Sequence, residues 1–338
     1  MKKFLDFWAM NSKKIYLVLL ALALIFPWVF NKPYIMNVAV LCFLYTTLSL
    51  SLNLVTGYMG QLSLGHAAFY GVGAYAGAIC ATRLGCDFLL TIVISAGVAA
   101  LVGLILSLPI LRLKGRYLAI VTLAFCEITR LVELNWVEVT GGPMGISSIP
   151  APHILGFTLK STRSKYYLIV AITLVTIFIV HSLMNSRTGR SISAIKGDEI
   201  AASAMGINVF KYKVICFTIA SALAGVAGAF YATYMRYVDP TSFAFDQSVQ
   251  ILGMTILGGL GSIPGSVIGA FVLTAIPEML RGLMEFRQVI YGLILAIMVV
   301  FKPSGLLGNI NFKHIRQRIL FARENAKKGG GDRGPAES

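Results

Sequence analysis

The chain has 338 residues, of which 57% are hydrophobic and only 13% charged, with a formal net charge of +15 and a mean hydropathy of +0.78. Water-soluble domains carry about 25% charged residues, so the composition excludes an ordinary soluble protein. It predicts an all-α integral membrane protein, because lipid forces each spanning segment to satisfy its own backbone hydrogen bonds. The excess of Lys and Arg is typical of cytoplasmic loops, and no nucleic-acid partner is expected.

About ten transmembrane helices are expected from the apolar runs. They are placed at 15–30, 34–55, 63–82, 88–111, 116–136, 164–185, 213–235, 246–261, 264–281 and 286–302. The eighth is short and rich in glycine, which leaves a re-entrant segment open as an alternative.

Charge tests this count. If all ten segments cross from a cytoplasmic N-terminus, the inner pieces are the N-terminus, 112–116, 186–213 and the tail, and these hold most of the Lys and Arg residues. This is the distribution that the positive-inside rule predicts. We therefore expect both termini in the cytoplasm, a permease domain over residues 1–310, and a basic, disordered tail over 311–338.

Two expected inner turns carry no charge and are rich in glycine: "TGYMGQ" at 56–61 and "GGLGSIPG" at 258–265. Irregular backbone at membrane depth is tolerated where protein buries it or where it lines a watery cavity, and broken helices of this kind mark transport sites. Gln61, Ser63 and His66 are therefore expected to line the path or to hold the broken turn. For His66, a structural hydrogen bond is favoured over a proton relay.

Small residues recur at intervals of four in the apolar segments, as in Gly73 and Gly77 or in Ala220, Ala224 and Gly228. This spacing lets helix backbones approach closely. It predicts a compact helical bundle.

One charged pair lies inside an expected span. Glu127 and Arg130 are three residues apart and share a helix face. Charges kept at membrane depth tend to face a cavity or a partner. Two interpretations stay open: an ion pair that fixes helix packing, or contacts with the ammonium and carboxylate groups of an amino acid on its way through.

The inner loop 186–213 is the longest polar piece before the tail. Within it, "DEIAASAMG" predicts a short helix that begins at Asp198 and Glu199, whose charges suit a helix N-terminus, and ends at Gly206. The small residues on its face are suited to docking in a groove on another protein. A helix that is simply exposed to solvent is an equal alternative. The candidate coupling residues are Arg187, Arg190, Glu199, Ala201, Ala202 and Gly206; the two arginines suit acidic groups on a partner or lipid phosphates.

Several separated motifs, in order, resemble one family. They are "GQLSLGHAAFYGVGAY", "LKGRYLAIVTLAF", "TGGPMGI", "SRTGRSISAIKGDEIAASAMGINVFKYK" and "ILGGLGSIPGSVIGA". Together they resemble the LivM-type permease subunits of branched-chain amino acid ABC importers. The similarity runs from about residue 35 to 310.

The resemblance implies a fold related to the ten-helix permeases of the cobalamin importer class and a bacterial inner-membrane location. It also implies four kinds of partner: a LivH-type second permease, two ABC ATPase subunits, an extracytoplasmic substrate-binding protein and the amino acid itself, within membrane lipid. The loop is similar to the family's coupling motif, Glu-Ala-Ala followed by glycine, at Glu199, Ala201, Ala202 and Gly206. This chain departs from that motif at Ile200, which stands between Glu199 and Ala201.

No enzyme chemistry, cofactor or metal site is expected. The chain has no GxxxxGK[ST] loop to cradle phosphates, no nucleophile–base pair and no metal-ligand spacing among its five cysteines, so ATP hydrolysis is expected on separate subunits. The expected function is an importer permease for branched-chain amino acids. A permease for urea or short amides is the near alternative, and a self-sufficient secondary transporter or channel is the alternative from another class.

Overall fold

The computed structural model describes residues 12–30, 32–110, 115–154, 156–159 and 161–279, together with 292, 293, 296, 305 and 306. The chain divides into two compact units, and residues 12–30 belong to the first while the other described residues belong to the second. In the first unit, the described residues form helix α2 (Ser12–Val29), where the sequence predicts a span at 15–30.

The second unit is built from helices that match the predicted spans in order. They are α3 (Pro33–Asn53), α4 (His66–Arg83), α5 (Phe88–Ile110), α6 (Arg116–Asn135), α8 (Thr162–Asn185), α11 (Val209–Met235), α12 (Phe245–Gly258) and α13 (Ile263–Met279). Four stretches of the described chain are long and apolar enough to cross a membrane: Pro33–Tyr58, Phe88–Pro109, Thr162–Asn185 and Val209–Met235. The helical membrane class is thus confirmed. Most of the tenth expected span and the whole tail 311–338 lie outside the described residues.

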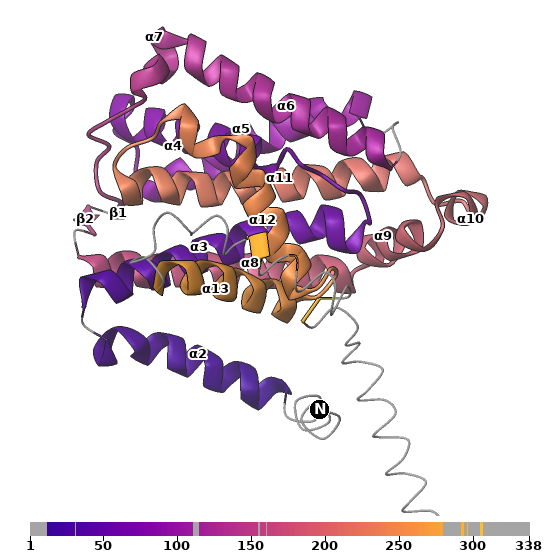
Figure 1. The fold of residues 1–338 in the computed structure, drawn as a ribbon, viewed down its shortest axis with the longest axis horizontal. Coiled ribbons are helices and arrows are strands. Elements are labelled where there is room, and N and C mark those ends of the chain that lie inside the picture. The colour runs from indigo at the N-terminus through magenta and orange to yellow at the C-terminus, as the bar shows by residue number, and fades with distance from the viewer. Residues whose placement is uncertain are drawn as a thin grey trace, which may run out of the picture. The chain divides into compact units, whose positions relative to one another are not determined.

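Helix α11 packs against α4, α5 and α3, and α3 in turn packs against α8 and α13 (Figure 1). The contact between α4 and α11 depends on glycine. A Cβ on Gly73 would lie 2.3 Å from Cα of Gly225, and a Cβ on Gly228 would lie 2.3 Å from the carbonyl oxygen of Tyr70. The small-residue spacing in the sequence therefore serves close backbone contact between these two helices.

The surface helices differ from the central ones in what they expose. Helix α5 presents a row of exposed apolar side chains, among them Val93, Leu101 and Ile105, each more than half exposed. By contrast, most of α3 is buried, including its polar residues Thr46, Ser49 and Asn53. A continuous exposed apolar face is what a membrane-spanning helix offers to lipid or to another spanning subunit.

Short elements connect the helices on the side predicted to face outward. They are α7 (Val137–Thr140), η2 (Gly142–Met144), the hairpin of β1 (His153–Ile154) and β2 (Phe157–Thr158), and η3 (Pro240–Phe243). The "TGGPMGI" stretch folds as an ordered turn: Gly141, Gly142 and Gly145 have positive φ. It ends in a pair of backbone hydrogen bonds between Ile146 and Val238.

On the side predicted to face the cytoplasm, α3 runs directly into the π-helix η1 (Leu54–Tyr58), and irregular backbone follows until α4 begins at His66. The predicted broken turn at 56–61 is therefore present. The loop 186–213 folds into two helices, α9 (Arg187–Gly197) and α10 (Glu199–Ala204). The sequence predicts only the second of them.

Helix α12 is the short element of the bundle. Its 14 residues span about 21 Å at 1.5 Å per residue, less than the ~30 Å hydrocarbon core. Figure 1 shows α12 lying across the direction of α4 and α11. The short, glycine-rich eighth segment is thus a helix of less than membrane length.

Candidate functional site

The two glycine-rich inner turns touch each other. A Cβ on Gly57 would lie 2.4 Å from the backbone nitrogen of Gly261, so only glycine allows this approach. Gly261 also has a φ of +80°, a conformation that other residues resist. Two turns about 200 residues apart in the sequence therefore form one structural unit.

Asn53, the last residue of α3, ties the turns together. Its Oδ1 accepts a hydrogen bond of 2.8 Å from the backbone nitrogen of Gly261, and its Nδ2 donates to Ser266 Oγ at 2.7 Å and to the Ser262 carbonyl at 3.2 Å. Asn53 is fully buried. A buried amide whose donors and acceptor are used in this way rigidifies its surroundings.

Helix α9 reaches the same unit through Lys196. The Nζ atom of Lys196 donates a hydrogen bond of 2.6 Å to the carbonyl oxygen of Gly57. Its amine also lies 3.6 Å from the position that a Cβ on Gly261 would take. Lys196 thus lies over both turns and connects them to the loop 186–213.

Glu199, the first residue of α10, makes a second connection. Its Oε1 accepts a hydrogen bond of 3.0 Å from Gln61 Nε2 and forms an ion pair with Lys213 Nζ. Lys213 lies in the first turns of α11 and is 2% exposed. We name the set of Gly57, Gln61, Lys196, Glu199 and Lys213 the loop junction. It joins α9 and α10 both to the broken turn and to the central helix α11.

Local sequence explains how Glu199 is placed. Asp198 caps α10, because its Oδ1 accepts hydrogen bonds from the backbone nitrogens of Ile200 and Ala201 at 2.7 and 3.0 Å. Gly206 follows the helix with a φ of +80°. The predicted helix start and the predicted glycine stop are both present.

The remaining coupling candidates divide between surface and interior. Arg187, Arg190 and Ala201 are exposed, whereas Ala202 is only 5% exposed and packs within its own chain. The side chains that α10 and its end present outward are Ile200, 76% exposed, and Met205, 82% exposed. Two exposed apolar side chains on a polar loop form an apolar surface that a partner can cover.

His66 and Ser63 follow the broken turn and are both 2% exposed. His66 Nε2 lies 2.6 Å from Ser51 Oγ, the structural hydrogen bond that the sequence favours for a lone histidine. Ser63 Oγ is buried without a hydrogen-bond partner among the described residues. Ser63 therefore has hydrogen-bonding capacity to offer beside the broken turn.

Glu127 and Arg130 bind each other on α6. Arg130 donates from Nε and Nη2 to Glu127 Oε2, both at 2.9 Å, and about a third of each side chain is exposed. No hydrogen bond or ion pair within the described part of the chain joins them to Gln61, Ser63 or His66. Within the described residues, the Glu127–Arg130 pair is therefore not bonded to these residues at the broken turn.

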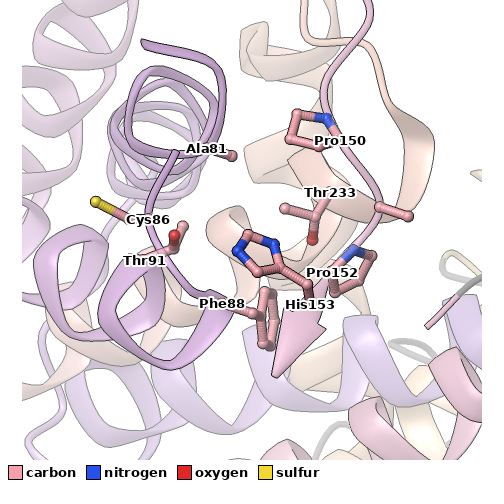
Figure 2. Close-up of a pocket in the computed structure, with 9 residues that line it drawn as sticks. Ala81, Cys86, Phe88, Thr91, Pro150, Pro152, His153 and Thr233 are labelled. Atoms are coloured by element: carbon pink, nitrogen blue, oxygen red, sulfur yellow. The ribbon is translucent and has the colours of Figure 1, made fainter. Parts of the chain in front are cut away.

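A small pocket lies at the opposite end of α4. Figure 2 shows His153 between Phe88, Pro152 and Thr233. His153 Nε2 also lies 3.1 Å from Asp87 Oδ1. The lining is largely apolar, and the pocket is formed by the outer connections rather than by the broken turns. We place no substrate site there.

Sequence reasoning missed three members of this arrangement. Asn53 and Lys213 are polar residues at the ends of apolar runs, and Lys196 lies in a basic loop, so each is ordinary in its local context. A polar residue directly beside an uncharged glycine-rich turn is the signal that identifies Asn53. Lys196 and Lys213 are recognisable only by the partners that the fold brings to them.

Comparisons with known proteins place most of the chain in one family. The family described as "Branched-chain amino acid transport system / permease component" matches residues 34–301. The High-affinity branched-chain amino acid transport system permease protein LivM of Escherichia coli K12 is 36% identical over 88% of this chain and 75% of its own length. A probable LivM of Methanocaldococcus jannaschii is 25% identical over 78% of this chain and 90% of its own.

LivH of Escherichia coli K12, also named as a high-affinity branched-chain amino acid transport permease, is more distant. It is 24% identical over 78% of this chain and 91% of its own length. No solved structure matches the chain. The matched region 34–301 includes both glycine-rich turns and every residue of the loop junction.

Proposed function

This chain belongs to the family of permease components of branched-chain amino acid transport systems, and we propose a mechanism for it as the LivM-type subunit of an ABC importer. It is a multi-pass membrane permease for branched-chain amino acids. The proposed assembly pairs it with a LivH-type second permease, two ATPase subunits and an extracytoplasmic binding protein in a bacterial inner membrane, with both of its termini in the cytoplasm.

The loop junction is the observation that carries the proposed mechanism. Lys196 on α9 bonds the broken turn at Gly57, and Glu199 on α10 bonds both Gln61 and Lys213. A displacement of α9 and α10 therefore acts on the broken turn and on α11 together. We propose that the loop 186–213 is the coupling element, and that it passes motion of the ATPases into the bundle through these bonds.

The proposed docking surface is the exposed side of this loop. Ile200 and Met205 supply apolar contact area, and Arg187 and Arg190 supply charge for acidic groups of the ATPase or for lipid phosphates. Ala202 is buried, so its proposed role is to hold α10 against its own chain. Ala201 and Gly206 remain exposed at the docking side.

The broken turn is the proposed inner part of the substrate path. Gln61, Ser63 and His66 lie there, and Ser63 has a free hydroxyl among the described residues. Glu127 and Arg130 are the second proposed contact, where their opposite charges suit a zwitterion once their mutual pairing opens. ATP and substrate drive alternating access only if they bind the inward-facing and outward-facing states with different affinity.

Uptake in reconstituted vesicles tests the proposed function. The permease is reconstituted with its neighbouring permease, the ATPases and the binding protein, and uptake of radiolabelled leucine, valine and urea is measured with and without ATP. We expect uptake of leucine and valine only with ATP. ATP-driven uptake of urea alone would assign the chain to a urea importer, and uptake without ATP would indicate a channel or secondary transporter.

A matched pair of variants tests the docking surface. Ile200→Asp places a charge in the proposed apolar contact and is expected to abolish co-purification of the ATPases. Lys211→Asp changes an exposed residue on α11 outside that surface and is expected to leave co-purification intact. Equal retention of the ATPases by both variants would contradict docking through α10.

A further inference from the structure

The carboxylate of Glu133 is buried in the described part of the chain. Glu133 lies on α6, is 5% exposed, and neither of its carboxylate oxygens has a hydrogen-bond partner among the described residues. Arg130 is the nearest cation on the same helix, but its guanidinium is bound to Glu127. A buried carboxylate is costly to ionise unless a cation or hydrogen-bond donors compensate its charge. Glu133 therefore has unused capacity to bind a cation.

A second unsatisfied oxygen lies on the facing helix. A Cβ on Gly71 of α4 would lie 2.7 Å from Glu133 Oε1, so the carboxylate rests directly over this glycine. Tyr75 is one helical turn further along α4 and therefore on the same face. It is 4% exposed, and its hydroxyl also has no partner among the described residues. Glu133 of α6 and Tyr75 of α4 are thus both buried, and neither has a hydrogen-bond partner for its polar group among the described residues.

Aromatic rings surround this position. The Cγ atom of Phe243, from η3, would lie 2.9 Å from a Cβ on Gly71, so its ring lies beside the carboxylate. Its centroid is 6.1 Å from that of Tyr75 and 5.1 Å from that of Tyr70. Aromatic faces attract cations within about 6 Å, and more strongly when water is excluded.

We propose that Glu133 and Tyr75 form a binding site for the ammonium group of the amino acid during its passage. An ammonium group has three N–H donors, which suits two carboxylate oxygens and one hydroxyl oxygen. The ring of Phe243 is 1% exposed and fills the space beside the carboxylate, so binding requires this ring to swing aside. The inference rests on the proposed function, because it takes the transported amino acid as the ligand.

This site differs from the one expected from the sequence. On α6, the sequence draws attention to Glu127 and Arg130, which neutralise each other and are about a third exposed. Glu133 lies six residues beyond Glu127 and continues the same three-residue spacing, but unlike Glu127 and Arg130 it is buried. It faces α4, the helix that follows the broken turn.

Glutamine at position 133 separates a binding role from a structural one. Gln has the size of Glu and resembles the protonated acid, so Glu133→Gln is harmless if Glu133 serves only as a neutral buried side chain. If the carboxylate binds the ammonium group, Glu133→Gln lowers ATP-driven uptake of radiolabelled leucine tenfold or more. Glu133→Asp, which keeps the charge, restores part of the uptake, and Tyr75→Phe lowers it several-fold.

The controls are made in the same vesicles. Glu138→Gln, the same substitution at an exposed position of α7, is expected to leave uptake within twofold of wild type. Co-purification of the ATPases with Glu133→Gln is measured alongside, so that a lower uptake can be told from a failure of the complex to assemble. If the wild-type complex takes up leucine and Glu133→Gln takes it up equally well, this inference is wrong but the proposed function stands. If the wild-type complex takes up no leucine, both the proposed function and this inference are wrong.

Discussion

Lys196 on α9 donates a hydrogen bond of 2.6 Å to the carbonyl oxygen of Gly57, a residue 139 positions earlier in the chain. Gly57 in turn lies against Gly261 of the second glycine-rich turn. One lysine thus connects α9 to both glycine-rich turns. The relationship gives a direct physical route from the loop 186–213 to the proposed path.

Replacing Lys196 with Met should loosen coupling while the bundle stays folded. Hydrogen bonds to charged groups contribute about 1.5–3 kcal/mol, and about 1.4 kcal/mol is a factor of ten. We therefore expect the number of leucine molecules transported per ATP hydrolysed to fall about tenfold. Lys211→Met, at an exposed position of α11, is the control and should keep the wild-type ratio. An unchanged ratio in Lys196→Met would show that this bond does not transmit motion.

The ion pair of Glu199 and Lys213 should behave as a coupled unit in stability. Lys213 is 2% exposed, so Glu199→Gln leaves a buried ammonium without its counter-charge, which is costly. The double variant Glu199→Gln/Lys213→Met should be less destabilised than the sum of the two single variants, by about 1–3 kcal/mol. Thermal unfolding of the purified permease in detergent measures the three variants. Strict additivity would mean that the two side chains do not stabilise each other.

Gly73→Ala should destabilise the bundle, because the added Cβ would lie 2.3 Å from Cα of Gly225 and backbone cannot yield as a side chain does. Overpacking of this kind costs about 1–3 kcal/mol. Gly97→Ala is the matched control: it lies in α5, and no atom comes within 4 Å of the added Cβ. That variant should be neutral or more stable by about 0.5–1 kcal/mol, since alanine is the better helix former. Equal melting temperatures for both variants would contradict close packing of α4 and α11.

The expected topology is open to cysteine labelling. In a cysteine-free variant, Ser147→Cys in the outer connection should react with a membrane-impermeant thiol reagent added to whole cells. Ser193→Cys on α9 should react only after the membrane is opened. Both positions are exposed in the structure, so lack of access reflects the membrane and not burial. Labelling of Ser193→Cys from outside would reverse the orientation.

Long apolar runs in the sequence predicted the positions of the spanning helices. The spans expected between 15 and 281 correspond to α2, α3, α4, α5, α6, α8, α11, α12 and α13, because long apolar runs leave helices as the only way to satisfy the backbone in lipid. The break at 56–61 was predicted from composition as well, because an uncharged stretch with several glycines is typical of irregular backbone rather than of a regular spanning helix. Helix α9 was missed because its sequence, "RTGRSISAIKG", has two glycines and little apolar length.

The candidate site was only partly accessible to sequence reasoning. Gln61 and Glu199 were each singled out, but nothing in their local context pairs them across 138 residues. Nothing in the local sequence distinguishes Glu133 from its charged neighbours Glu127 and Arg130. Its burial follows from the absence of a side chain at Gly71 on a different helix, which no local pattern on α6 reveals.

The sequence by itself determined the membrane class, the positions of the long apolar helices, the two glycine-rich turns and the membership of the family, because these depend on composition, local spacing and similarity along the chain. The tertiary structure decided which polar groups meet. Lys196 and Gly57 come from separate helices, and so do Glu199 and Lys213. The free energy of a buried charge depends on the partner that lies within a few ångströms of it, and that distance is a property of helix packing rather than of any one segment.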